Sequence, residues 1–214
     1  MKYSAILFDL DGTLLYTLED ITDALNRALE TRGFPGRSVE EVRRFVGSGS
    51  GKLVERALPG GADGRLVKSV LEEYREDYAA HCNVKTRPYD GIKELLRELG
   101  ARGIKLGLVS NKPDGAVREL AEAHFPGLFS AVTGERIGTM RKPAPDMVFA
   151  AMEEMGIGPE ECLYIGDSEV DIATAENAGL PCVSVTWGFR SREELIKNGA
   201  AKLIDRPEEL LEYF

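Results

Sequence analysis

Apolar residues recur along this chain with two different spacings. A short apolar run at residues 5–8 has the length and composition of a buried strand. From residue 87 onward, similar runs alternate with segments in which apolar residues recur every three or four positions, as at Ile92, Leu95, Leu96 and Leu99. We expect further strands at 104–110, 131–134, 162–166, 182–186 and 201–204, and helices at 113–123, 145–155, 169–178, 192–198 and 207–213. This alternation predicts an α/β fold with a Rossmann-like, mostly parallel sheet and right-handed helical crossovers.

Residues 15–83 show the helical spacing alone and no strand pattern. Ser38 and Glu41 have the spacing of a capping box, and Thr17 with Asp20 is expected to cap an earlier helix. A longer helix carries its apolar residues on one face, namely Leu66, Val67, Val70, Leu71, Tyr74 and Tyr78. The pattern predicts a helical cap subdomain at 15–83, inserted into an α/β core made of residues 1–14 and 84–214.

The composition is that of an ordinary globular chain, and it narrows the range of partners. Of 214 residues, 43% are hydrophobic and 29% are charged. The net charge is −9 and no basic block stands out, so we expect no nucleic-acid partner. No apolar stretch has the length of a membrane span, acids interrupt the first apolar run, and the three cysteines form no C-x-x-C pair. These features favour a cytoplasmic protein that contacts no membrane. The sequence leaves open whether it is a monomer or a homodimer.

The most informative segment follows the first strand and contains two acids. Asp9 and Asp11 stand two residues apart where the strand should end, and Gly12 allows a sharp turn. Open α/β sheets bind their ligands at the carboxyl ends of parallel strands. Two acids this close repel each other unless a cation or a shared proton intervenes, so one can act as a nucleophile and the other as a proton carrier. The alternatives are an acidic turn and a calcium loop, and the latter fails because Leu14 stands where its glycine is required.

Three further polar clusters follow later strands. Ser110 and Asn111 end the second core strand, where they can donate to phosphate oxygens or form an N-cap turn. Lys142 stands in a proline turn after the third strand, either as a charge on a phosphoryl group or as a solvated lysine. Asp167 and Asp171 open the helix after the fourth strand, as metal ligands or as capping acids. Because all four clusters fall at the carboxyl ends of strands, one crevice can collect them.

A glycine-rich loop at 47–51 lies within the helical region and is followed by Lys52. It does not meet the P-loop pattern, because the required first glycine and the required hydroxyl residue are both missing. We interpret it as a flexible loop that contacts substrate or, equally, as a plain linker. Arg44, Gly49 and Lys52 are the candidate substrate contacts, since a second anionic group on a substrate needs a cationic partner.

The four clusters occur in the order of four motifs of the haloacid dehalogenase superfamily, which this chain resembles over nearly its whole length. The wider similarity is to phosphoglycolate-phosphatase-like enzymes, and it is carried by residues 8–15, 45–58, 87–113, 141–146, 164–178 and 187–190. Tyr16 departs from the pattern, because many relatives have an acid there, near the hinge of the subdomain. The resemblance implies a parallel-sheet core with an inserted helical cap that closes over the site.

The resemblance also implies a chemistry, a magnesium-dependent hydrolysis of a phosphomonoester. Asp9 would become an aspartyl phosphate, and Asp11 would protonate the leaving oxygen and then deprotonate the attacking water. The acid at position 11 favours phosphatases and phosphomutases over dehalogenases. The implied substrate is a small phosphorylated metabolite, phosphoglycolate or a similar ester. The alternatives are a phosphomutase like beta-phosphoglucomutase, an inorganic pyrophosphatase and a non-catalytic regulatory binding module.

The remaining site residues receive their roles from the same resemblance. The implied groups around Mg²⁺ are Asp9, the main-chain carbonyl of Asp11, and Asp167, with Asp171 in support. The implied contacts to the phosphoryl oxygens are Ser110, Asn111 and Lys142.

Overall fold

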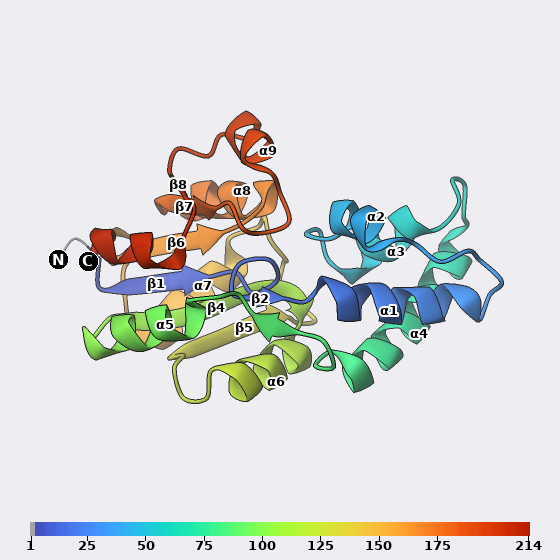
Figure 1. Cartoon of the computed structure of the whole chain (residues 1–214), viewed down its shortest axis with the longest axis horizontal. Helices are drawn as coiled ribbons and strands as arrows, with labels where there is room; N and C mark the ends of the chain where they lie inside the picture. Colours follow the sequence, from blue (N-terminus) through green and yellow to red (C-terminus); the bar gives the residue numbers. More distant parts are fainter. Residues whose placement is uncertain (1–2) are drawn as a thin grey trace. The chain divides into compact units, whose positions relative to one another are not determined.

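The computed structural model describes residues 3–214, and the chain divides into two compact units (Figure 1). The first unit comprises Met1–Tyr16 and Pro88–Phe214, and the second comprises Thr17–Arg87. The boundaries expected from the sequence, after residues 14 and 83, lie two and four residues earlier than these.

Two short strands that the sequence pattern does not reveal lie where the chain passes between the units. They are β2 (Leu15–Tyr16) and β3 (Arg87–Pro88), which pair in a two-stranded sheet. The expectation that residues 15–83 contain no strand is therefore wrong at its first two residues. A strand of two residues is too short to show a periodicity in the sequence.

Six strands of the first unit form one sheet in the order β5-β4-β1-β6-β7-β8, and each neighbouring pair is parallel. The strands are β1 (Ala5–Phe8), β4 (Lys105–Pro113), β5 (Ala131–Glu135), β6 (Cys162–Gly166), β7 (Cys182–Val185) and β8 (Leu203–Ile204). The chain builds β4 and β5 on one side of β1 and the other three strands on the opposite side. The strand order therefore reverses at β1, and its carboxyl end is the switch point where such sheets bind ligands.

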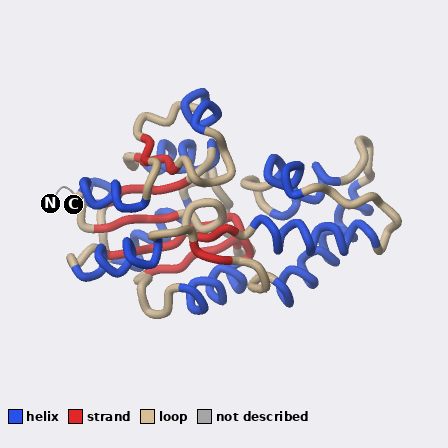
Figure 2. The backbone as a smooth tube through the Cα atoms, viewed as in Figure 1, coloured by secondary structure: helices blue, strands red, loops and turns tan. Residues whose placement is uncertain are grey.

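Helices flank this sheet (Figure 2). They are α5 (Ile92–Ala101), α6 (Asp114–His124), α7 (Asp146–Met155), α8 (Glu169–Ala178), α9 (Arg192–Lys197) and the 3₁₀ helices η1 (Pro159–Glu161) and η2 (Pro207–Tyr213). The expected helix at 207–213 is thus a 3₁₀ helix. Pro113 and Pro145, expected as first helical residues, are instead the N-cap residues of α6 and α7. The predicted α/β class with a parallel sheet is confirmed.

The sheet and α7 share a core that fixes how closely the strands approach. Leu7 of β1 packs in one buried cluster with Met147 and Met155 of α7. Gly107 of β4 leaves room for this contact, because a Cβ atom there would lie 2.6 Å from Leu7 Cδ2. Each large apolar side chain buried in this way contributes about 1.5–3 kcal/mol to stability.

The second unit holds four helices, α1 (Leu18–Glu30), α2 (Val39–Phe45), α3 (Ser50–Ala57) and α4 (Gly64–His81). The capping box expected at the start of α2 is confirmed. Ser38 Oγ accepts from the Glu41 N–H at 3.3 Å, and Glu41 Oε2 accepts from the Ser38 N–H at 2.8 Å. The third helix begins at Ser50 and not after Gly51 as expected.

The capping pair expected at Thr17 and Asp20 is wrong. The Thr17 side chain makes no capping hydrogen bond. Asp20 is 2% exposed, and its carboxylate accepts from the main-chain N–H groups of Val84, Lys85 and Thr86 at 2.8–3.0 Å. The acid therefore ties α1 to the segment that follows α4 and supports no helix end.

We expect Asp20→Ala to destabilise the protein by about 3 kcal/mol, because three N–H groups lose a charged acceptor. Asp23→Ala is the matched control. Asp23 forms an ion pair with Lys85 in which the side chains are 38% and 47% exposed, so its loss should cost less than about 1 kcal/mol. Urea unfolding of both variants measures the difference, and equal losses would contradict the role given to Asp20.

Candidate active site

The loop after β1 is held by hydrogen bonds that converge on one carbonyl group. The Leu10 carbonyl accepts from the N–H groups of Thr13, Leu14 and Leu15 at 3.4, 3.0 and 3.0 Å. Gly12 has φ +88°, and a Cβ atom there would lie 2.3 Å from Asp167 Oδ2. Glycine is thus required both by the backbone conformation and by the close approach of the acid.

Three acids from two strand ends gather around one lysine. Oxygen atoms of Asp9, Asp167 and Asp171 lie within 4.8 Å of one another, and all three residues are buried. Lys142 Nζ lies 2.7 Å from Asp9 Oδ1 and 2.7 Å from Asp171 Oδ1. If all three acids are ionised, three carboxylates and one ammonium leave a net charge of two negative units in a buried space. A hard divalent cation bound by oxygen atoms would balance that charge.

Asp171 holds Lys142 with one carboxylate oxygen and is itself held by Ser168 at the other. Its Oδ1 atom accepts from Lys142 and, at 3.2 Å, from the hydroxyl of Tyr164. Its Oδ2 atom accepts from the N–H and hydroxyl groups of Ser168 at 3.1 and 2.6 Å. A Cβ atom at Gly166 would lie 2.3 Å from the Asp171 side chain, so the main chain at Gly166 also packs closely against this acid.

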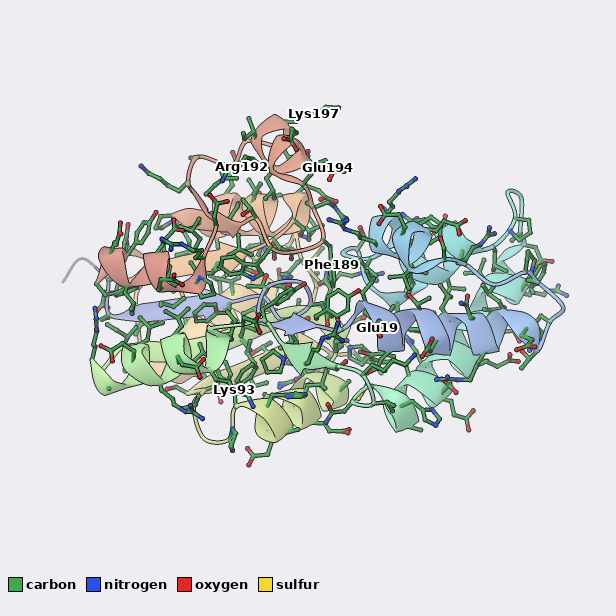
Figure 3. The ribbon with its side chains drawn as sticks, viewed as in Figure 1. Glu19, Lys93, Phe189, Arg192, Glu194 and Lys197 are labelled. Carbon is green, nitrogen blue, oxygen red and sulfur yellow. The ribbon has the colours of Figure 1, made fainter. Side chains whose placement is uncertain are left out.

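Asp167 lies between two loops. Its oxygen atoms accept from the Thr13 hydroxyl at 3.3 Å and from the Phe189 N–H at 2.7 Å. Phe189 is labelled in Figure 3. A Cβ atom at Gly188 would lie 2.3 Å from Asp167 Cβ. Burial, reinforced by the charge of Asp171, raises the pKa of Asp167 from its ordinary 3.8 to about 7.

Opposing effects act on the pair formed by Asp9 and Lys142. Burial raises the pKa of Asp9 well above its ordinary value, although the charge of Lys142 works against it. Burial alone would lower the pKa of Lys142, but the charges of Asp171 and Asp9 outweigh it and raise that pKa. Lys142 is therefore an ammonium at neutral pH.

The residues at the end of β4 lie beside the lysine. The Asn111 side chain holds the main chain of Lys142, and its expected contact with phosphate stays a prediction. The Asn111 amide donates to the Lys142 carbonyl at 3.0 Å, and its oxygen accepts from the Lys142 N–H at 2.8 Å. This geometry makes Asn111 a positioning residue. Ser110, which is 1% exposed, accepts from the Lys112 N–H at 3.3 Å.

Two residues of the site carry no sequence-based assignment. Lys112 Nζ lies 3.0 Å from Asp11 Oδ1, and the lysine side chain is 3% exposed. Tyr164 is fully buried and accepts a hydrogen bond from Lys142 at 3.1 Å. A charged residue at the end of a buried strand was a usable signal for Lys112. A tyrosine inside an apolar strand offers no such signal.

The three candidate substrate contacts in and beside the glycine-rich loop lie in the second unit. Arg44 is 71% exposed and lies 3.7 Å from Glu40. Lys52 is 53% exposed and lies 2.7 Å from Glu55. Gly49 is the N-cap residue of α3. Contact of Arg44, Gly49 and Lys52 with substrate stays a prediction.

Comparison with known proteins agrees with this geometry. The family model described as haloacid dehalogenase-like hydrolase matches residues 6–185. A phosphoglycolate phosphatase of Rhodospirillum rubrum is 36% identical and covers 94% of this chain and 86% of its own length. An N-acetylmuramic acid 6-phosphate phosphatase of Pseudomonas aeruginosa is 34% identical, with 99% and 95% covered. A crystal structure from Lactobacillus delbrueckii subsp. bulgaricus, provisionally described as a phosphoglycolate phosphatase, has a TM-score of 0.95 at 41% identity and covers 100% of this chain and 98% of that chain.

The chain belongs to the haloacid dehalogenase-like hydrolases. Within that class it is a phosphatase, a hydrolase of phosphoric monoesters. The family and the enzymatic class expected from the sequence are confirmed. Among residues 3–214, no helix is both long enough and apolar enough to cross a membrane.

We expect the metal-free protein to lose stability as pH rises. The pKa of Asp167 is 3.8 ordinarily and about 7 in the folded chain, so the folded chain holds a proton that the unfolded chain releases. The stabilisation by that proton is complete below pH 3.8 and is lost as pH rises through about 7. Asp167→Asn should flatten this slope because an amide is neutral throughout.

The measurement is the midpoint of thermal unfolding in excess chelator, from about pH 4 to about pH 8. Asp205→Asn is the control, because the pKa of Asp205 is lowered by its hydrogen bonds to Thr186 and Arg192 and lies outside this window. An unchanged slope in Asp167→Asn would assign the proton to another acid.

Proposed function

We propose that this phosphatase acts on a small phosphomonoester through a covalent intermediate on Asp9. The observation that carries the proposal is the ion pair between Asp9 and Lys142, buried at the switch point of the sheet. The ammonium orients one carboxylate oxygen and leaves the other for attack. Asp11, two residues later and 21% exposed in its side chain, is open enough to exchange protons with substrate and water.

The chemistry divides into two transfers at one phosphorus atom. Asp9 attacks phosphorus, and the bond to the ester oxygen breaks while Asp11 gives that oxygen its proton. Asp11 then takes a proton from a water molecule that attacks the aspartyl phosphate, which releases inorganic phosphate and restores Asp9. Lys142 and the Ser110 hydroxyl stabilise the phosphoryl oxygens, where negative charge is concentrated in both transition states.

The donor set of the site fits Mg²⁺. Carboxylates of Asp9 and Asp167 and the main-chain carbonyl of Asp11 would hold the ion, and Asp171 would support it through Lys142 and Ser168. The fit rests on oxygen-only donors and on the two negative charges that the buried acids leave unbalanced. When bound, the cation supplies positive charge to the phosphoryl oxygens.

Phosphoglycolate is the substrate that the comparisons support best, because the relative from Rhodospirillum rubrum carries that name. An amino-sugar phosphate is the second candidate, supported by the name of the Pseudomonas aeruginosa relative. Phosphate release from phosphoglycolate, N-acetylmuramic acid 6-phosphate and pyrophosphate on one preparation tests the choice. A preference of more than about tenfold for either of the last two in kcat/KM would remove the glycolate assignment.

We expect Asp9→Asn to lower kcat/KM by at least about 1,000-fold while the protein stays folded, because the nucleophile is lost. Asp11→Asn should slow alkyl esters much more than p-nitrophenyl phosphate, whose leaving group departs without a proton. Phosphate release from both substrates measures these effects, with the exposed Asp90→Asn as control. An equal loss on both substrates in Asp11→Asn would argue against its role as general acid.

We expect chelation to abolish phosphate release and Mg²⁺ to restore it, whereas Ca²⁺ should restore it poorly because it accepts a looser geometry. Binding of Mg²⁺ is followed independently of turnover, through the midpoint of thermal unfolding. Mg²⁺ should raise the unfolding midpoint of the wild type and raise that of Asp167→Asn much less. Full activity in excess chelator would refute the metal assignment.

A further inference from the structure

The site contains a second buried lysine that the chemistry above does not use. Lys112 is the penultimate residue of β4, its side chain is 3% exposed, and its Nζ atom lies 3.0 Å from Asp11 Oδ1. Burying an ammonium is unfavourable unless nearby negative groups compensate for the lost hydration. Asp11 supplies one such group, which places the charge of Lys112 beside this acid.

The two buried lysines face different parts of the reaction. Lys142 has three N–H groups, and they are directed to Asp9, Asp171 and the Tyr164 hydroxyl. That lysine belongs to the nucleophile. Lys112 instead approaches the acid that serves the leaving group. Asp11 Oδ1 is buried and accepts no well-formed hydrogen bond within residues 3–214, so its contact with Lys112 is an ion pair without hydrogen-bond geometry.

Distance places Lys112 beside the first atoms of the leaving group. A general acid must come within hydrogen-bond reach of the ester oxygen that it protonates. Lys112 Nζ lies 3.0 Å from Asp11 Oδ1. Its ammonium would therefore lie close to the carbon group that is bonded to the ester oxygen of a substrate. In the phosphate ester of a 2-hydroxy acid, the carboxylate is separated from the ester oxygen by a single carbon atom. Such a carboxylate is the anion best placed to meet Lys112.

We propose that Lys112 is a specificity-determining residue, selecting leaving groups that carry a carboxylate on the carbon next to the ester oxygen. This inference rests on the proposed function, because it takes Asp11 as the acid that meets the leaving oxygen. The role differs from the one expected for Arg44 and Lys52. Those side chains are 71% and 53% exposed and already pair with glutamates, so water screens their charges. A buried ammonium discriminates more strongly, because little water competes for the substrate anion.

The test compares two esters that differ only in the anion. 2-Phosphoglycolate carries the carboxylate, and 2-hydroxyethyl phosphate has a hydroxymethyl group in its place. The ratio of their kcat/KM values isolates the recognition of the carboxylate from any general effect on Asp11. We expect the wild type to favour phosphoglycolate and Lys112→Gln to lower that ratio by at least about thirtyfold, because a buried charge pair is lost.

Two further variants complete the test, one that retains the charge of Lys112 and one that serves as a control. Lys112→Arg retains the charge and should retain part of the preference, which a purely steric role would not produce. Lys105→Gln is the matched control, since it removes an exposed lysine at the amino end of the same strand, where Nζ donates to the Met155 carbonyl. It should leave the ratio unchanged. Circular dichroism and the thermal midpoint establish that each variant is folded.

The outcomes separate this proposal from the proposed substrate. If Lys112→Gln loses the same factor on both esters, Lys112 only orients Asp11 and the proposal is overturned, while the phosphatase assignment stands. A third outcome is that the wild type prefers 2-phospholactate over both esters, and that Lys112→Gln loses the preference for 2-phospholactate over the neutral ester that matches it. In that case the glycolate assignment fails and the role of Lys112 stands. A wild type that hydrolyses p-nitrophenyl phosphate but favours no carboxylate-bearing ester over its neutral counterpart overturns both.

Discussion

Confinement of three carboxylates beside one ammonium is the constraint on which the rest of this structure depends. Asp9, Asp167 and Asp171 lose hydration on burial, and Lys142 offsets only part of that loss through its contacts with two of them. The remaining negative charge is unfavourable by itself and would attract a cation. The electrostatic repulsion that lowers stability is therefore the same property that would favour the proposed metal ion.

The surrounding main chain holds the three acids and Lys142 close together. Gly12, Gly166 and Gly188 let main chain approach the acids where any Cβ atom would collide with them. Asn111 fixes the main chain of Lys142 from the neighbouring strand. Repulsion among the acids would otherwise spread the site apart, so its geometry is set by packing and by main-chain hydrogen bonds more than by attraction between the charged groups themselves.

The proposed mechanism divides the charges between the two ends of the reaction. In it, Lys142 and Asp171 would serve the nucleophile Asp9. Lys112 and Asp11 would serve the leaving group. A mostly acidic chain can thus recognise an anionic substrate through local cations that are shielded from its surface charge.

The sequence by itself determined most of the helices and strands and which polar residues stand at the strand ends. Hydrophobic spacing located the sheet and its helices, and local motifs located Asp9, Asp11, Lys142, Asp167 and Asp171 at strand ends. Tertiary structure decided which groups meet. Lys142 and Asp9 are 133 residues apart, and the role of Asn111, the partner of Asp20 and the pairing of Lys112 with Asp11 all depend on strand register and loop packing. Periodicity reports which way a side chain faces, whereas a contact between distant residues is set by the fold that brings them together.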